Sequence, residues 1–325
     1  MKTMTITASD HGLPVDLDRV TIRNSNRSVI KRKVNMFTRI LVATDLSEAS
    51  ERFICELGGL RKLGSTEIVL IHCLNIRDVG SLAFQLMDLA KPEFDRHKKL
   101  LEDQGFKVKA KMVLGLPHIE IIRQADAHDC SLIVIGSHGR TMAADILLGS
   151  VAGAVIQSVT KPVLVLHLRL KKEGDRTVCE EVTCDPHKHV LFPTDFSDVA
   201  ERAFTYLEQI VRSGGRRVTL LHVRDKSRIY GDLQDKLEEF NRIDRERLER
   251  MQNRLKDIGA VEVSIELAYG LPKQEIVRYL HRGDYSMVVM GTQGRGFFGK
   301  LMMGSVANYV VRNTLIPTFF VPPLK

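Results

Sequence analysis

The chain has 325 residues, of which 44% are hydrophobic, and it carries a formal net charge of +8 with a pI near 9.2. This length and apolar content suffice for two cores of ordinary size, and no apolar run approaches the length of a membrane span. Half of the excess charge, +4, lies in residues 1–36. The composition therefore argues against a membrane protein and gives only weak support to an electrostatic nucleic-acid binder.

Apolar runs of strand length alternate with amphipathic segments after residues 1–36. That leading segment is a basic N-terminal extension, either a native arm or residues that precede a start at Met36. The predicted strands of the first half are 39–43, 68–73, 107–113, 131–135 and 163–167. The predicted helices are 49–63, 118–128, 150–158 and one that follows the strand at 68–73 and ends at 101. In the second half the long helix covers about 233–258, and its many charge pairs are typical of a solvated helix face. This alternation predicts parallel, doubly wound α/β sheets.

The second half of the chain repeats the first. The matching segments are Arg39–Ser47 and His189–Ser197, Ile68–His72 and Val218–His222, and Gly115–Pro117 and Gly270–Pro272. The period is too long for a solenoid, so the repeat predicts two complete domains, at 37–170 and 188–325, joined by a linker at 171–187.

The cysteines favour a reducing compartment. There are five, an odd number, and they show no framework spacing, so we expect a cytoplasmic protein. Cys179 and Cys184 lie in the linker near His187 and His189, where a metal site is one interpretation. Their spacing fits no standard zinc pattern, so we predict that the protein itself provides no metal site.

Each repeat carries a glycine motif directly after an apolar strand. Two residues separate Gly136 from Gly139, and nine more residues lead to Gly149 and Ser150. The second repeat has the same spacing at Gly291, Gly294, Gly304 and Ser305. Glycines let backbone N–H groups approach an anion, and a helix N-terminus supplies free donors and partial positive charge. The paired motifs predict a phosphate site beyond the carboxyl ends of the strands in each repeat.

With these motifs in place, each repeat resembles a universal stress protein domain of the nucleotide-binding branch, and the chain resembles a tandem member of that family. The resemblance implies an adenine nucleotide alpha hydrolase-like, Rossmann-like fold with two five-stranded parallel sheets arranged as a pseudo-twofold pair. It also implies ATP, or ADP or AMP, as the ligand, with Mg²⁺ carried on the nucleotide phosphates. The residues that match the family pattern are Asp45 and Asp195 beside ribose and adenine, Cys73 and Val223 holding adenine through backbone groups, and Gly136, Gly139, Gly149, Ser150, Val151, Gly291, Gly294, Gly304, Ser305 and Val306 around the phosphates.

Simpler roles stand beside these. Ser150 and Ser305 could be helix N-caps, and the aspartates Asp45 and Asp195 could cap the helices that follow them. The histidines His72 and His222 end apolar strands and read as core residues rather than catalytic ones. The other candidates are His138, which Gln293 replaces in the second repeat, and the pair Arg140 and Arg295, which could bind phosphate or form surface ion pairs.

The sequence favours a sensor or regulator in stress response over an enzyme. The glycine loops contain no Walker lysine and no acidic cluster marks a catalytic metal, so we predict no catalytic residues and at most weak ATP hydrolysis. The alternatives are a slow ATPase and, third, a nucleic-acid binder acting through the basic tail. The expected partners are an adenine nucleotide and an unknown protein client, with no membrane and no nucleic acid among them.

Two expectations concern the relation between the repeats. Their last strands, Val163–His167 and Thr318–Val321, are apolar, so they should pair with each other inside the chain; further homodimerisation stays open. Within the motifs, Asp145 occupies the position of Lys300. If that position faces the phosphates, the second site should bind the polyanion more tightly.

Overall fold

The structure is a computed structural model that describes residues 37–79, 82–137, 148–167, 169–173, 176–180, 185–225, 237–295 and 302–324. Residues 35–325 form one compact unit. Its first-repeat strands are β1 (Arg39–Thr44), β2 (Glu67–Asn75), β3 (Lys107–Gly115), β4 (Leu132–Gly136) and β5 (Val163–Leu166). The second-repeat strands are β8 (Val190–Pro193), β9 (Arg217–Asp225), β10 (Glu262–Gly270), β11 (Met287–Gly291) and β12 (Thr318–Val321).

Helices connect these strands in the predicted alternation. In the first repeat they are α1 (Glu48–Cys55), the 3₁₀ helix η1 (Glu56–Leu63), α2 (Ile76–Val79), α3 (Ala83–Asp103), α4 (Pro117–Ala127) and α5 (Ser150–Ser158). In the second they are α6 (Asp198–Arg212), α7 (Leu237–Asp257), α8 (Pro272–Arg282) and α9 (Ser305–Arg312). The predicted helix at 49–63 divides into α1 and η1, and the division falls just before the poor helix formers Gly58 and Gly59.

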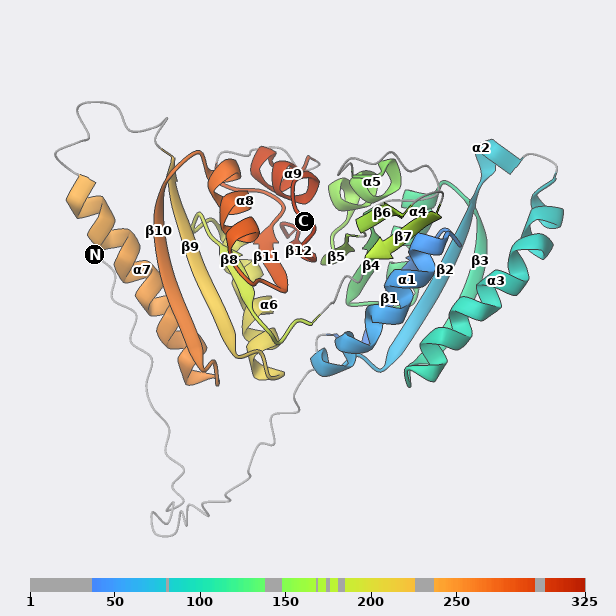
Figure 1. Ribbon diagram of the computed structural model, residues 1–325, viewed down its shortest axis with the longest axis horizontal. Coiled ribbons are helices and arrows are strands. Elements are labelled where there is room, and N and C mark those ends of the chain that lie inside the picture. The colour runs from blue at the N-terminus through green and yellow to red at the C-terminus, as the bar shows by residue number, and fades with distance from the viewer. Residues whose placement is uncertain are drawn as a thin grey trace, which may run out of the picture. The chain divides into compact units, whose positions relative to one another are not determined.

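The strands form one sheet in the order β10-β9-β8-β11-β12-β5-β4-β1-β2-β3 (Figure 1). Within each repeat every neighbouring pair is parallel, and the two halves have the same strand order. They join where β12 pairs antiparallel with β5, which confirms the predicted pairing of the last strands. Leu164 and Phe319 are equivalent residues and lie directly opposite each other. The pseudo-twofold axis therefore passes between these two residues.

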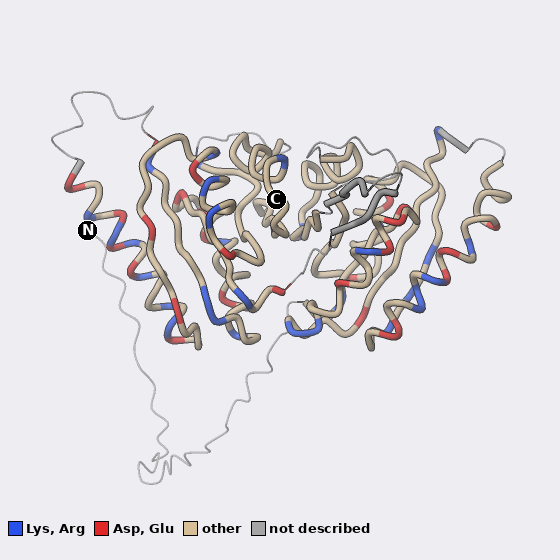
Figure 2. The backbone as a smooth tube through the Cα atoms, in the orientation of Figure 1, with Lys and Arg blue, Asp and Glu red and all other residues tan. Residues whose placement is uncertain are grey.

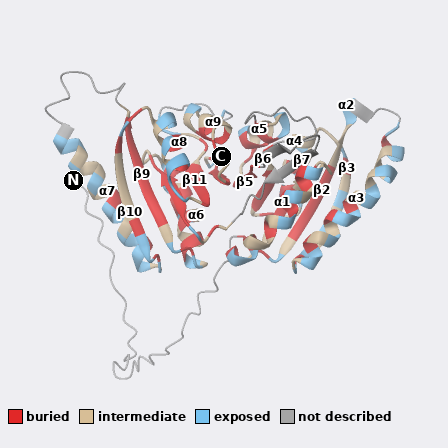
Figure 3. Cartoon of the chain, in the orientation of Figure 1, coloured by how far each residue is buried: buried red, intermediate tan, exposed pale blue. Residues whose placement is uncertain are grey.

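Both faces of the sheet are covered by helices, as the near-continuous apolar strands require. One core layer is formed with α1, η1, α3, α6 and α7 and the other with α4, α5, α8 and α9, and each layer runs through both repeats. Figure 3 shows the result as buried strands beneath helices that are exposed on their outer sides. This doubly wound arrangement brings the carboxyl ends of β1, β2 and β4, and of β8, β9 and β11, to one edge of each half.

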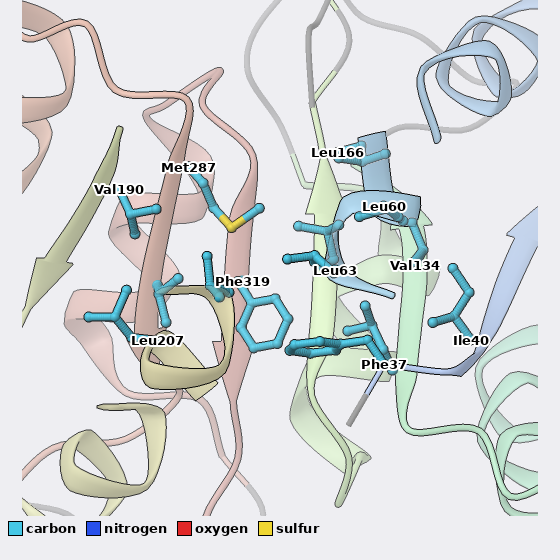
Figure 4. Close-up of a cluster of buried hydrophobic side chains, with 14 of the residues drawn as sticks. Phe37, Ile40, Leu60, Leu63, Val134, Leu166, Val190, Leu207, Met287 and Phe319 are labelled. Carbon is cyan, nitrogen blue, oxygen red and sulfur yellow. The ribbon is translucent and has the colours of Figure 1, made fainter. Parts of the chain in front are cut away.

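An aromatic cluster fills the junction of the repeats on one face of the sheet. The ring of Phe37 meets that of Phe319 edge-on with 5.9 Å between centroids (Figure 4). The ring centroid of Tyr206 lies 5.8 Å from that of Phe319. Phe37 and Phe319 are fully buried. Since these residues come from opposite repeats, their packing adds to the β5–β12 hydrogen bonds in holding the two halves together.

The polar segment predicted as a linker contains regular structure. Strands β6 (Arg169–Glu173) and β7 (Arg176–Glu180) pair antiparallel as a separate two-stranded ribbon. Composition did not reveal this ribbon, because its polar residues lack the apolar alternation by which a half-buried strand is recognised.

Candidate functional site

The first strand of each repeat ends in a tight turn around the predicted aspartate. Asp195 Oδ1 accepts hydrogen bonds from the backbone N–H and the hydroxyl of Ser197, at 3.0 and 2.6 Å. Ser197, in turn, caps α6 by accepting from the N–H of Ala200. Phe196 between them has φ of 58°, in the left-handed region that costs energy for a non-glycine residue. The turn is thus held in a strained form that fixes the carboxylate at the strand end.

The first repeat builds the same turn. Asp45 Oδ1 accepts from the N–H and the hydroxyl of Ser47, Leu46 has φ of 60°, and Ser47 caps α1 through Ser50 N–H. The helix cap is therefore the serine two residues after the aspartate and not the aspartate itself. The interpretation of Asp45 and Asp195 as helix caps is therefore wrong. Each carboxylate instead accepts hydrogen bonds from the serine that caps the helix.

In the second repeat the aspartate also holds the glycine motif. Asp195 Oδ2 accepts a hydrogen bond from the backbone N–H of Arg295 at 2.8 Å. A Cβ added at Gly294 would lie 2.5 Å from this same oxygen, and one added at Gly291 would lie 2.8 Å from Val199. Both positions therefore need glycine because other groups approach them closely. Gly139, His138, Arg140 and Asp145 fall outside the described residues, as does Lys300.

The glycine motif leads directly into a helix whose N-terminus has no side-chain cap. Gly304 N–H donates to the carbonyl oxygen of Thr292 at 2.8 Å, and Gly149 N–H donates to that of Ser137 at 2.7 Å. The residue before each helix is thus bonded to the end of the preceding strand. Gly149 and Gly304 are the cap residues, and no described side chain caps α5 or α9. Ser150 and Ser305 are instead the first residues of these helices, so the N-cap interpretation is wrong for both. The first-turn N–H groups, which include those of Val151 and Val306, have no intrahelical acceptor and can serve an anion.

The second strand of each repeat places a histidine just before the predicted adenine contact. His222 is 8% exposed, and its Nδ1 lies 2.7 Å from the carbonyl oxygen of Thr194. His72 is likewise buried and contacts the carbonyl of Thr44 at 2.9 Å. The His72 ring thus links β2 to β1, and the His222 ring links β9 to the end of β8. The contacts support the structural role over the catalytic one.

The predicted adenine contacts follow these histidines. Val223 is nearly buried, and Cys73 occupies its place in the first repeat. Burial raises the pKa of the Cys73 thiol to about 11, so the side chain stays protonated and behaves as a small apolar group. Having cysteine at 73 where the second repeat has Val223 therefore keeps this position apolar.

These elements surround one cavity of about 870 Å³ in the second repeat. All seven residues predicted for this repeat line it, and they are Asp195, Val223, Gly291, Gly294, Gly304, Ser305 and Val306. The volume lies in the range of small-molecule sites. In the first repeat, Gly136, Gly149, Ser150 and Val151 keep the corresponding places at the end of β4 and the start of α5, and Asp45 and Cys73 those at the ends of β1 and β2.

One wall of this cavity was not predicted from the sequence. It is formed by Arg224 at the end of β9 and by Phe240, Ile243, Asp244 and Arg247 of α7. Arg224 donates to Asp244, whose Oδ2 also lies 3.5 Å from His222 Nε2. Figure 2 shows the alternating charges along α7. The sequence signal for this wall is the pair of charged residues Arg224 and Asp225 at the end of β9, because packing of the strand alone requires no charge there.

One group of side chains in the first repeat has the composition of a metal site. Ligand atoms of Glu51, Glu93 and His97 lie within 4.8 Å of one another, and His97 is fully buried. The Arg96 guanidinium, however, pairs with both Glu51 and Glu93. Part of the negative charge that would attract a cation is thus already neutralised. Cys179 and Cys184 belong to residues whose side chains the structure does not describe.

The buried histidine of the second repeat should make stability depend on pH. Burial lowers the pKa of His222 below its ordinary value near 6.5. Below pH 6.5 the unfolded chain therefore binds more protons at this residue than the folded chain, so its contribution to stability is present above pH 6.5 and is lost as the pH falls. We expect His222→Gln to reduce the loss of urea-unfolding free energy between pH 7.5 and 5.5. The exposed His281→Gln serves as control, and equal pH slopes in all three proteins would contradict the assignment.

A model described as the universal stress protein family matches the chain twice, over residues 36–167 and 186–322. The chain belongs to this family. Universal stress protein MJ0577 of Methanocaldococcus jannaschii is 34% identical over 154 residues, which cover 40% of this chain and 95% of that protein. A universal stress protein of Mycolicibacterium smegmatis is 27% identical over 300 residues, which cover 87% of this chain and 97% of that protein.

The fold also agrees with that of a solved universal stress protein. The structure of one from Archaeoglobus fulgidus covers 87% of this chain and 96% of its own, with 24% sequence identity and a TM-score of 0.63. The family resemblance and the α/β fold predicted from the sequence are therefore confirmed. Within the described part of the chain, no helix combines the length and the apolar character that crossing a membrane requires.

Proposed function

We propose that this universal stress protein binds adenine nucleotide in both repeats and acts as a nucleotide-dependent sensor or regulator. The observation that carries the proposal is the convergence of all seven predicted second-repeat residues on one cavity beside the uncapped N-terminus of α9. Free N–H groups and close glycine backbone suit a phosphate chain, and the strand end at Val223 suits a base. The first repeat carries the same motif, so we assign it the same ligand class.

The phosphates would bind through backbone groups. The N–H groups of the first turn of α9 and the motif glycines would donate to them, and Mg²⁺ would be held on the nucleotide itself. The Asp195 carboxylate, fixed by Ser197 and Arg295, would accept from ribose hydroxyls. Because these hydrogen bonds already hold the Asp195 carboxylate in place, it would need little ordering when the ligand binds.

Two measurements on purified full-length protein test the proposal. The first is the nucleotide released on denaturation of protein purified without added ligand, together with calorimetric titration of ATP, ADP and AMP. We expect adenine nucleotide to copurify and two sites per chain to titrate. Binding of none of the three nucleotides would contradict the proposal.

The second measurement separates a regulator from a slow ATPase. Protein is incubated with labelled ATP, and bound and released products are followed over hours. A regulator should retain ATP unchanged for many times the dissociation time of the complex. Multiple turnovers per site would instead favour the enzyme.

A further inference from the structure

Seven Lys, Arg and Asp side chains line the cavity of the second repeat. The basic ones are Arg224, Arg247, Lys273 and Arg295, here called the cationic wall, and the acidic ones are Asp195, Asp225 and Asp244. Counted together, these seven positions carry a net charge of +1. Such charges inside a concave site act on a ligand more strongly than charges on an open surface, because less water screens them.

Arg224 is the most enclosed member of the wall. Its side chain is 8% exposed, and its guanidinium donates to Asp244 of α7 and lies 5.7 Å from the ring centre of Phe240. Its buried Nε–H nevertheless has no hydrogen-bond partner among the described residues. A buried donor without a partner is costly, so its presence beside a cavity points to an acceptor that arrives with a ligand.

Two more members of the wall gather at the strained turn. The guanidinium of Arg247 lies 5.3 Å from the ring centre of Phe196, and that of Arg295 lies 5.7 Å from it. Two like charges that share one aromatic ring repel each other. Arg247 lies 3.8 Å from Asp244 Oδ1, whereas the contact of Arg295 with Asp195 is made by its backbone N–H. An anionic ligand in the cavity would relieve this repulsion.

By sequence, three of the four positions of the cationic wall have no Lys or Arg in the first repeat. When equivalent elements of the two repeats are aligned, β2 with β9 and α4 with α8, Leu74 takes the place of Arg224 and His118 that of Lys273. Helices α3 and α7 align through their matched final turns at Gly105 and Gly259, and this alignment puts Glu93 at the position of Arg247. It also puts Ala90 at the position of Asp244. With Asn75, Asp45 and Arg140 at the other three positions, the seven sum to −1 with histidine neutral.

We propose that the cationic wall makes the second repeat selective for nucleoside polyphosphates, whereas the first repeat binds adenine nucleotides with little regard to the number of phosphates. This inference rests on the proposed function, because it requires that both repeats bind adenine nucleotide. Its physical basis is that each added phosphate charge gains attraction from a net positive cavity and gains less, or loses, in a net negative one. The simpler interpretation is that Arg224 and Asp244 form a structural ion pair between β9 and α7.

The test compares how affinity depends on phosphate number in each repeat. Kd values for adenosine, AMP, ADP and ATP are measured by calorimetry on two full-length proteins, Gly139→Val to silence the first repeat and Gly294→Val to silence the second. We expect the gain in affinity from AMP to ATP to be about tenfold larger in the second repeat. The difference should shrink when the salt concentration rises from 50 to about 500 mM, because salt screens the wall.

Substitutions then assign the effect to the wall. In the Gly139→Val background, Arg224→Leu installs the first repeat's residue on β9 and lowers the net charge of the cavity by one. Arg247→Glu does the same on α7 and lowers it by two. Each should lower ATP affinity by about tenfold and leave adenosine affinity within about twofold. The matched control is Arg250→Ala, which removes an exposed charge from α7 outside the cavity and should change neither. The converse graft, Leu74→Arg in the Gly294→Val background, adds one positive charge and should steepen the dependence of affinity on phosphate number in the first repeat.

The outcomes separate this inference from the proposed function. Equal gains from AMP to ATP in the two repeats, with binding intact, would overturn the inference alone. Equal loss of adenosine and ATP affinity in the Arg224→Leu protein would show that Arg224 and Asp244 form a structural ion pair, and would also overturn the inference. If the unmodified protein bound none of the four ligands, the proposed function would fail and this inference with it.

Discussion

Replacing Gly294 with valine should abolish nucleotide binding by the second repeat and leave the first repeat unaffected. Even a Cβ at this position would lie 2.5 Å from Asp195 Oδ2, the oxygen that accepts from Arg295 N–H. The larger side chain must displace the carboxylate or the loop, and with either movement the groups that face the ligand lose their places. Loss of about two hydrogen bonds to charged phosphate, at about 1.5 kcal/mol each, weakens binding by about 100-fold.

Calorimetry with ATP should then find one site in Gly294→Val where the unmodified protein has two. Gly294→Ala should weaken binding less, because the alanine side chain is smaller. The control is Gly153→Ala on α5, where the new Cβ meets only Leu148 at 3.6 Å, an ordinary contact distance. Retention of two sites by Gly294→Val, with unchanged affinities, would show that this glycine does not face the ligand.

Phe319→Ala should be among the most destabilising single substitutions in the chain. The side chain is fully buried on the pseudo-twofold axis and packs on Phe37 and Tyr206. Removing a buried phenylalanine ring leaves a cavity and typically costs about 3–5 kcal/mol. Because the Phe319 ring packs against the first repeat, its removal should weaken the interaction between the two halves of the sheet in particular.

Urea unfolding followed by circular dichroism measures this loss. The exposed Phe84→Ala serves as the matched control, since its ring is 82% exposed, and it should change the free energy of unfolding by about 0.5 kcal/mol or less. A second effect is expected in Phe319→Ala, namely a broader transition as the two halves begin to unfold separately. A change of less than about 1 kcal/mol would mean that the junction relaxes around the missing ring.

The parts of the site predicted from the sequence are those encoded locally. Gly291, Gly294 and Gly304 lie where a strand, a loop and a helix start follow one another, and this order is visible in a short stretch of residues. The repeat supplied a second copy against which each position could be checked. The pairing of β5 with β12 was also predictable, because two apolar last strands would otherwise be left as open edges.

The charged wall on α7 could not be predicted in the same way. The charges of Asp244 and Arg247 look like those of any solvated helix, since i,i+4 pairing has the same pattern on both faces. Only the tertiary structure shows that this part of α7 lies over the end of β9, where Arg224 meets it. The N-cap role considered for Ser150 and Ser305 was wrong for a related reason. Serine is favoured at both the cap and the first turn, and the backbone alone tells the two positions apart.

The junction at Leu164 and Phe319 has a further consequence for how the protein responds to dilution. Two separate subunits joined along such an edge would dissociate as their concentration fell, whereas two repeats of one chain keep a constant effective concentration of each other. The two repeats are therefore present one to one in every molecule, at any level of expression. An axial position in a homodimer must also fit its own copy, but here an aliphatic side chain faces an aromatic one. Each half is thus free to differ from the other while the pair stays intact.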